Sequence, residues 1–219
     1  MEKGFKELQL SAKSAFLFYA ALMLVYFFAG SFFQVSLGLL GIFLNQILLI
    51  GLPVALLAYV KDCDLLDWPC WSWPGIFPLF ITLLSILALT FGIDQLIALQ
   101  DKYFPPPLFI EEFFKELTAV RSTPEGIAKV IALAITPAFC EEIFFRGLLL
   151  PSWSKKFGWL LGNIFTSLAF ALAHGNLLYF HFYFILGFFM GVLMKWKNSL
   201  WLPILAHFTN NAWALFLGH

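Results

Sequence analysis

The sequence predicts an all-α fold: a polytopic membrane bundle of about seven transmembrane helices, with one further amphipathic helix on the membrane surface. The first observation is composition, because the 219 residues are 61% hydrophobic and only 12% charged. A soluble domain is about 45–50% apolar and about 25% charged. The second is a series of apolar runs, most of them near the roughly 20 residues that cross a bilayer. Since no repeat or low-complexity tract divides the chain, we expect one integral membrane domain over residues 1–219.

The predicted transmembrane helices follow these apolar runs in order along the chain. The first run follows a basic start and resembles a signal peptide, but it is long for one and no clean cleavage site follows, so we expect a retained span. The fifth run is shorter than the others. The runs are Ser14–Gly30, Val35–Val60, Gly75–Leu99, Ile127–Leu150, Leu160–His174, Leu177–Met194 and Leu200–Leu217.

Two connections between these spans have a distinct character. Residues 62–78 are rich in Trp and Pro, which is typical of an interfacial turn anchored by aromatic rings. Residues 105–120 place apolar side chains on one helical stripe opposite acidic ones, which predicts a helix on the membrane surface. A connector is favoured over a gate or lid for this segment. The stripe consists of Leu108, Phe109, Phe113, Phe114 and Leu117.

The distribution of Lys and Arg predicts which side of the membrane each connection faces. With seven spans, eight lysines fall on the side of the N-terminus: Lys3, Lys6, Lys13, Lys61, Lys155, Lys156, Lys195 and Lys197. The other side has four basic residues, diluted by acidic ones: Lys102, Lys115, Arg121 and Lys129. We therefore predict a cytoplasmic N-terminus and a C-terminus on the far side.

Ionisable residues inside membrane spans indicate functional sites, because burying them in hydrocarbon is costly. The last four spans contain Glu141, Glu142, Arg146, His174, His181, His207 and the pair Asn210–Asn211. The first three spans are expected to hold almost nothing comparable. Asp94 lies near the end of the third span, where headgroups or water can solvate it. His181 has no polar neighbour at helical spacing and is expected to be a core or interfacial histidine.

Helical spacing separates the two glutamates. Glu142 and Arg146 are four residues apart and can pair on one helix face, with the acid in the better, N-terminal position. Glu141 is rotated away from that arginine, which leaves its carboxylate free to act as a general base. The alternative is that all three residues only hold helices together.

Two further segments supply side chains for the same site. His207 and Asn211 are four residues apart on the seventh span, and His174 follows Phe170 by one turn on the fifth. Two His and a Glu from three helices can hold a water molecule or a metal ion in a bundle core. Pro137 and Pro203 each lie four residues before a polar site residue, where each is expected to break a backbone hydrogen bond and kink its helix.

The three motifs "EEIFFR", "FALAH" and "HFTNN" resemble those of the CAAX protease and bacteriocin-processing family, also called the Abi family. These are intramembrane endopeptidases that include the type II CAAX prenyl endopeptidases. The motifs occur in the family's order, and the resemblance covers residues 125–217, the expected catalytic core. The residues that carry the motifs are Glu141, Glu142, Arg146, Phe170, His174, His207 and Asn211.

The resemblance implies a glutamate-dependent endopeptidase acting on membrane proteins or lipidated peptides, including prenylated CAAX-type substrates. Glu141 would activate water, while His174, His207 and Asn211 would hold that water and stabilise the oxyanion. Glu142 and Arg146 would support the site. No cofactor is required in this interpretation, although zinc is an alternative, since the family has been described as metal-dependent. The sequence has no H-E-x-x-H motif.

Two other functions stay open at this point. Buried Glu, His and Arg also serve as relays in proton-coupled transporters, and a non-catalytic membrane scaffold of the same family would keep the same helices. The net charge of zero gives no indication of a nucleic-acid partner. The lipid bilayer is the expected environment, and the compact connections favour a prokaryotic cell membrane.

Overall fold

The computed structural model describes residues 8–63 and 69–217, and every secondary-structure element in these ranges is helical. This confirms the predicted all-α membrane bundle. Elements η1, η2, η4 and η5 are π-helical segments within longer helices, and η3 is a 3₁₀ turn. In chain order the elements are α1 (Ala12–Val25), η1 (Tyr26–Gly30), α2 (Ser31–Leu37), α3 (Leu39–Leu44), η2 (Asn45–Gly51), α4 (Leu52–Val60), η3 (Pro69–Trp71), α5 (Ile76–Tyr103), α6 (Leu108–Thr118), α7 (Thr123–Lys129), η4 (Val130–Ile135), α8 (Thr136–Glu142), η5 (Ile143–Leu149), α9 (Leu150–Phe157), α10 (Trp159–Ala173), α11 (Phe180–Lys197) and α12 (Trp201–Phe216).

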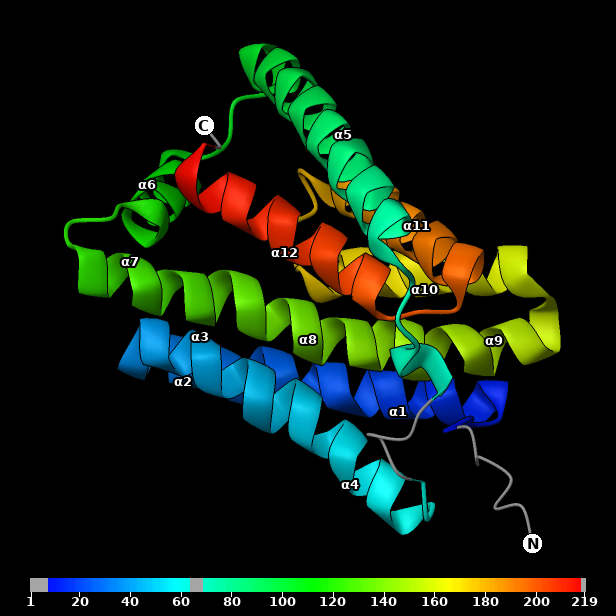
Figure 1. Cartoon of the computed structure of the whole chain (residues 1–219). Coiled ribbons are helices and arrows are strands. Elements are labelled where there is room, and N and C mark those ends of the chain that lie inside the picture. Colours follow the sequence, from blue (N-terminus) through cyan, green and yellow to red (C-terminus); the bar gives the residue numbers. More distant parts are fainter. Residues whose placement is uncertain (1–7, 64–68, 218–219) are drawn as a thin grey trace, which may run out of the picture.

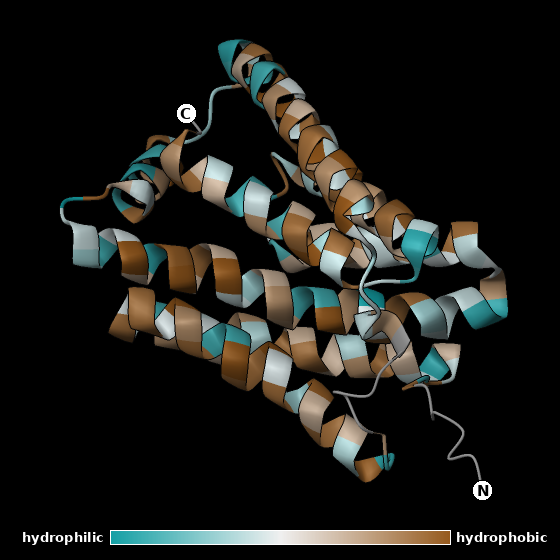
Figure 2. Cartoon of the chain, viewed as in Figure 1, coloured by the Kyte–Doolittle hydropathy of each residue, from teal (hydrophilic) through white to brown (hydrophobic). Residues whose placement is uncertain are grey.

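Each of the seven predicted apolar runs corresponds to a long helical stretch of the described chain. Three of these stretches are long and apolar enough to cross a membrane, namely Ala12–Leu37, Leu39–Val60 and Ile76–Tyr103, and Trp159–Ala173 is a shorter apolar helix. Figure 2 shows apolar residues along most of α1 to α5, with hydrophilic residues gathered on α6 and near several helix ends. The protein is therefore an integral membrane protein, and the full set of seven spans stays a prediction.

The continuous helix from α7 to α9 forms the centre of the bundle. In Figure 1 it runs between the α1–α4 hairpin on one side and α10, α11 and α12 on the other, with α5 crossing α12. The N-terminal end of α1, the α9–α10 turn and the C-terminal end of α11 lie toward one end of this bundle, and the α2–α3 turn and α6 lie toward the other (Figure 1). This arrangement agrees with the predicted alternation of the helices. Which end faces the cytoplasm stays a prediction.

The first helical hairpin turns at Gly38, whose φ of 55° is in the left-handed region. The sequence-based boundary at Gly30 was wrong, because the helix continues through η1 to Leu37. Gly30 instead permits close packing, and its carbonyl oxygen accepts a hydrogen bond of 2.9 Å from Asn45 Nδ2 on the facing helix. A β-carbon at Gly41 would lie 2.0 Å from the carbonyl oxygen of Phe33, so the two helices need glycine next to the turn.

The two prolines have different structural roles. Pro137 lies inside the central helix directly after the π-helical segment η4, and π segments of this kind often mark functional sites. Pro203 is the third residue of α12, where a backbone N–H has no partner within the helix in any case. The expectation that Pro203 breaks a hydrogen bond and kinks its helix is therefore wrong.

The predicted surface helix is present as α6, and its stripe is exposed except at half-buried Leu117, with Leu108 75% and Phe109 71% accessible. Its end is fastened by charged groups, since Arg121 binds the Glu116 carboxylate at 2.6 Å. That contact holds the pKa of Glu116 below its ordinary value.

Part of the predicted interfacial turn at 62–78 lies outside the described residues. The described part anchors α12, because Trp201 Nε1 donates to the Trp71 carbonyl at 3.1 Å.

Candidate active site

Four of the predicted site residues line one cavity of about 500 Å³ within the bundle. They come from three helices: Glu141 from α8, His174 from the end of α10, and His207 and Asn211 from α12. The described structure thus brings together side chains that are separated by up to 70 positions in the sequence. The remaining two predicted residues are fully buried behind this cavity.

Glu142 and Arg146 form the buried pair that their spacing predicts. Both side chains are 0% exposed, and Arg146 Nη1 donates to Glu142 Oε1 at 2.7 Å. The second guanidinium nitrogen, Nη2, donates to the Gly187 carbonyl oxygen at 2.7 Å, which ties α11 to the central helix. These hydrogen bonds offset part of the desolvation cost of the buried pair, while Glu142 Oε2 and Arg146 Nε have no hydrogen-bond partner among the described residues.

His207 extends this pair toward the cavity, which spacing along one helix could not predict. Its Nδ1 lies 2.8 Å from Glu142 Oε1, the same oxygen that Arg146 contacts. An ionised carboxylate only accepts, so Nδ1 carries the proton. A neutral imidazole therefore has its lone pair on Nε2, and this atom lies 4.0 Å from Glu141 Oε2. Two acceptors at that separation can both be reached by one water molecule, since each hydrogen bond spans about 2.8 Å.

Glu141 takes a different partner from Glu142. Its side chain is 12% exposed, and its Oε1 accepts a hydrogen bond of 2.7 Å from Gln46 Nε2. The sequence-based expectation that the first three spans hold almost nothing comparable was wrong, because Asn45 and Gln46 are both 4% exposed and Gln46 lines the cavity. The signal was present in the sequence as two consecutive amides inside the apolar run "GIFLNQILLIG".

Phe170, the first residue of the "FALAH" motif, packs against both histidines of the site. Its ring centroid lies 4.6 Å from that of His174 and 5.6 Å from that of His207, so one buried ring contacts both imidazoles. His174 Nδ1 lies 2.8 Å from the Phe170 carbonyl oxygen and donates to it, which leaves Nε2 for other partners. The ring of Tyr183 also stacks on His174, with a centroid distance of 4.1 Å. Sequence reasoning did not find this tyrosine or Tyr26, which also lines the cavity.

Asn211 is linked to Pro137 through the backbone. Pro137 has no N–H to donate to the carbonyl oxygen of Leu133, four residues earlier. Asn211 Nδ2 donates to this same oxygen at 3.1 Å, and so compensates the proline from the neighbouring helix. Asn211 Oδ1 accepts from Asn210 Nδ2 at 3.3 Å. Proline and asparagine therefore form one structural unit at the wall of the cavity.

Two other polar residues considered from the sequence, Asp94 and His181, do not line this cavity. Asp94 accepts a hydrogen bond from Trp213 Nε1, and His181 is exposed and packs against Phe182 with a centroid distance of 4.0 Å. Neither lines the cavity. By contrast, Phe114 and Leu117 of α6 do line it, so the surface helix borders the site.

The described residues do not fit the zinc set of two His and one Glu. Within the described ranges, no three His, Cys, Asp or Glu side chains are grouped so that they could hold a metal ion.

Comparisons with known proteins agree with the motifs. Residues 123–213 match the family described as type II CAAX prenyl endopeptidase Rce1-like. The chain is 32% identical over 113 residues to an uncharacterized 24.3 kDa protein of Escherichia coli, covering 49% of this chain and 52% of that protein. It is 25% identical over 88 residues to the "Putative membrane peptidase YdiL" of Bacillus subtilis (strain 168), covering 40% of this chain and 36% of the relative.

A second Bacillus subtilis protein, YpbD, is also uncharacterized and is 31% identical over 112 residues, covering 51% of this chain and 55% of YpbD. The matches thus span about half or less of each relative's length. No solved structure matches the chain. The matched segment, residues 123–213, contains all six predicted site residues, so the similarity to the Rce1-like family of type II CAAX prenyl endopeptidases covers the whole candidate site.

Proposed function

We propose that this protein is an intramembrane endopeptidase in which Glu141 activates a water molecule to hydrolyse peptide bonds of membrane-associated substrates. The observation that carries the proposal is the arrangement of Glu141, His174, His207 and Asn211 around one cavity. Within it, Glu141 accepts from a neutral amide, whereas the buried arginine binds Glu142. The similarity of residues 123–213 to a peptidase family supports the general reaction class.

The proposed hydrolysis begins with water held between Glu141 Oε2 and His207 Nε2, which are 4.0 Å apart. Such a water donates one hydrogen to each acceptor, and its lone pair is free to attack a carbonyl carbon. Glu141 takes the proton as the new C–O bond forms. The protonated Glu141 then gives this proton to the amide nitrogen as the C–N bond breaks, which yields a carboxylic acid and an amine.

The other polar groups supply orientation and charge stabilisation. Glu142 and Arg146 are positioning residues, because their contact with Nδ1 fixes the tautomer of His207. The Asn211 amide has a second N–H beyond the one that binds Leu133, and this hydrogen suits a developing oxyanion. His174 has Nε2 available after Nδ1 donates to Phe170.

The cavity wall indicates the kind of substrate. Besides the polar cluster, the wall is apolar and includes Met23, Phe27, Ile42 and, from α6, Phe114 and Leu117. An extended peptide with hydrophobic or lipid-modified side chains suits such a wall. We place the enzyme in a prokaryotic cell membrane with a cytoplasmic N-terminus, where unprenylated membrane peptides are more expected than prenylated CAAX proteins.

The activity is tested with purified protein in lipid nanodiscs and a panel of hydrophobic and prenylated peptides, with and without a chelator. Mass spectrometry of new peptide ends would identify cleavage. We expect chelator-insensitive cleavage of at least one peptide. A transporter would instead cleave none of them and would move protons across liposomes, and a scaffold would do neither, so both of these results contradict the proposal.

A further inference from the structure

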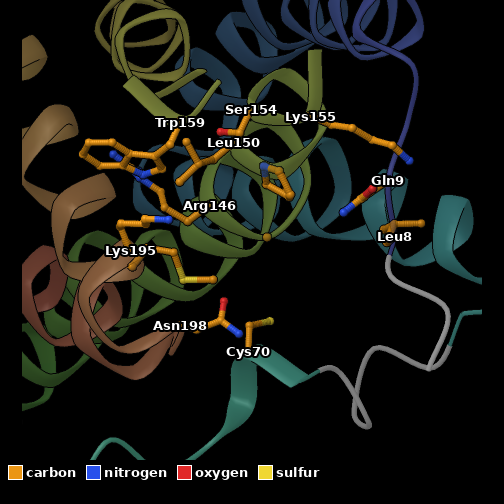
Figure 3. Close-up of a pocket in the computed structure, with 13 residues that line it drawn as sticks. Leu8, Gln9, Cys70, Arg146, Leu150, Ser154, Lys155, Trp159, Lys195 and Asn198 are labelled. Carbon is orange, nitrogen blue, oxygen red and sulfur yellow. The ribbon is translucent and has the colours of Figure 1, made fainter. Parts of the chain in front are cut away.

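A second cavity of about 510 Å³ is lined by Arg146 and shares no lining residue with the candidate active site. Figure 3 shows its lining residues, which come from the segment before α1, from η3, from the central helix, from α10 and from the end of α11. They include Arg146, Ser154, Lys155, Trp159, Lys195 and Asn198. None of these residues lines the active-site cavity.

Three buried donors in this lining have no hydrogen-bond partner among the described residues. They are Arg146 Nε, Ser154 Oγ and Trp159 Nε1. Arg146 is 0% exposed, so its Nε cannot be satisfied from bulk solvent. Buried donors in native proteins are almost always paired, and three unpaired ones around one cavity indicate an acceptor that binds there. An indole and a guanidinium N–H can only donate.

The charge of the lining narrows the chemistry of that acceptor. Lys155 and Lys195 are exposed residues at the same cavity and add two positive charges to it, while the charge of Arg146 is paired with Glu142. No Asp or Glu occurs among the described lining residues. A neutral acceptor such as water would satisfy single donors but would gain nothing from the charge of the two lysines. An anion with several oxygens satisfies both the donors and the charge.

The position of the cavity agrees with a lipid-facing anion site. It lies where α9 and α11 end in basic turns, Lys155–Lys156 and Lys195–Lys197, at the end of the bundle where α1 begins (Figure 1). Basic pockets between transmembrane helices at this level bind anionic headgroups. We infer that this cavity binds a phosphate group, held by Arg146 Nε, Ser154 Oγ and Trp159 Nε1 and attracted by the two lysines.

The test uses the full-length protein in maltoside micelles and three added ligands: phosphatidylglycerol, a galactosyl diacylglycerol with the same acyl chains, and inorganic phosphate. Melting temperature and bound lipid counted by native mass spectrometry are the readouts. We expect phosphatidylglycerol to raise the melting temperature and the galactolipid to have little effect. If inorganic phosphate raises the melting temperature as much as phosphatidylglycerol does, the phosphate group alone is the ligand. If only phosphatidylglycerol raises it, the ligand is the lipid headgroup.

Matched variants locate the binding. Trp159→Phe keeps the ring and removes the N–H, and Lys195→Gln removes one exposed charge. Each is expected to weaken binding about tenfold, the effect of losing one charge-assisted hydrogen bond. Trp196→Phe and Lys197→Gln change the same residue types on the same turn as Lys195 but outside the cavity, and should bind as the native protein does. Equal losses in Lys195→Gln and Lys197→Gln, or no stabilisation by either phosphate ligand, would overturn the inference.

Discussion

Nδ1 of His207 lies 2.8 Å from Oε1 of Glu142, and through this contact the third sequence motif is attached to the first. The same carboxylate oxygen accepts from Arg146 at 2.7 Å. A chain of three buried side chains therefore runs from the core of the bundle to the edge of the cavity. It holds His207 with one ring nitrogen toward Glu142 and the other toward Glu141.

Removing the charge of Glu142 should cost stability. In Glu142→Gln, the buried guanidinium of Arg146 loses its counter-charge, and breaking a buried pair in this way costs about 3–5 kcal/mol. We expect a lower free energy of unfolding by about that amount, measured by chemical denaturation in micelles. Glu112→Gln on α6 changes an exposed acid and should leave stability near that of the native protein.

A second substitution separates charge from shape at this pair. Arg146→Met combined with Glu142→Gln removes the unpaired cation and should recover part of the lost stability. If the double variant is no more stable than Glu142→Gln alone, the destabilisation does not come from the unpaired arginine.

The two neighbouring amides of η2 should affect different properties. Gln46→Leu removes the hydrogen bond to Glu141 and should lower the cleavage rate by roughly tenfold or more, since a hydrogen bond to a charged group contributes about 1.5–3 kcal/mol. Asn45→Leu removes the hydrogen bond between Asn45 and the Gly30 carbonyl oxygen, and leaves a gap between the two helices of the first hairpin, so it should lower the free energy of unfolding by about 1–3 kcal/mol. Both the cleavage rate and the free energy of unfolding are measured on each variant. If the two variants lose activity and stability to the same extent, the assignment of Gln46 to activity and Asn45 to stability is wrong.

Pro137 and Asn211 should show coupled effects on stability. Asn211→Ala leaves the Leu133 carbonyl without its donor and is expected to destabilise the protein by about 1–3 kcal/mol. Adding Pro137→Ala restores a backbone N–H in the central helix and should recover part of that loss. Activity should stay low in the double variant, because the amide is still absent from the cavity. Strictly additive stability losses in a double-mutant cycle would argue against the link.

The predictable part of this protein is the part encoded along single helices. The apolar runs located the helices, and the four-residue spacing identified the Glu142–Arg146 pair, because both patterns depend on one helix only. Gly30 was misread as a helix end because a glycine that permits close packing looks the same in sequence as one that terminates a helix. Contacts between helices, such as Gln46 with Glu141, depend on how the bundle packs.

The π-helical segments are a second reason why sequence patterns were insufficient. Asn45 and Gln46 lie in η2, where the wider π-helical turn shifts the direction of side chains relative to an α-helix. A 3.6-residue period applied to these stretches misplaces the faces. The satisfied Leu133 carbonyl likewise could not be foreseen, because its donor comes from α12.

The predicted orientation can be tested by labelling single cysteines in a cysteine-free background. A cysteine at Lys13 should react only from the cytoplasmic side, and one at Ser122, before α7, only from the outside. The reason is the concentration of lysines at the end of the bundle where α1 begins. Labelling of both positions from one side would contradict the alternation of spans, and an exchange of sides would invert the orientation.

The most direct test of the central claim is the cleavage rate of Glu141→Gln. Glutamine keeps the volume of the side chain and can still pair with Gln46, but it cannot take a proton from water. With a peptide that the native protein cleaves, the account predicts loss of cleavage with an unchanged melting temperature. Cleavage by Glu141→Gln at the native rate would contradict the assignment of Glu141 as the general base.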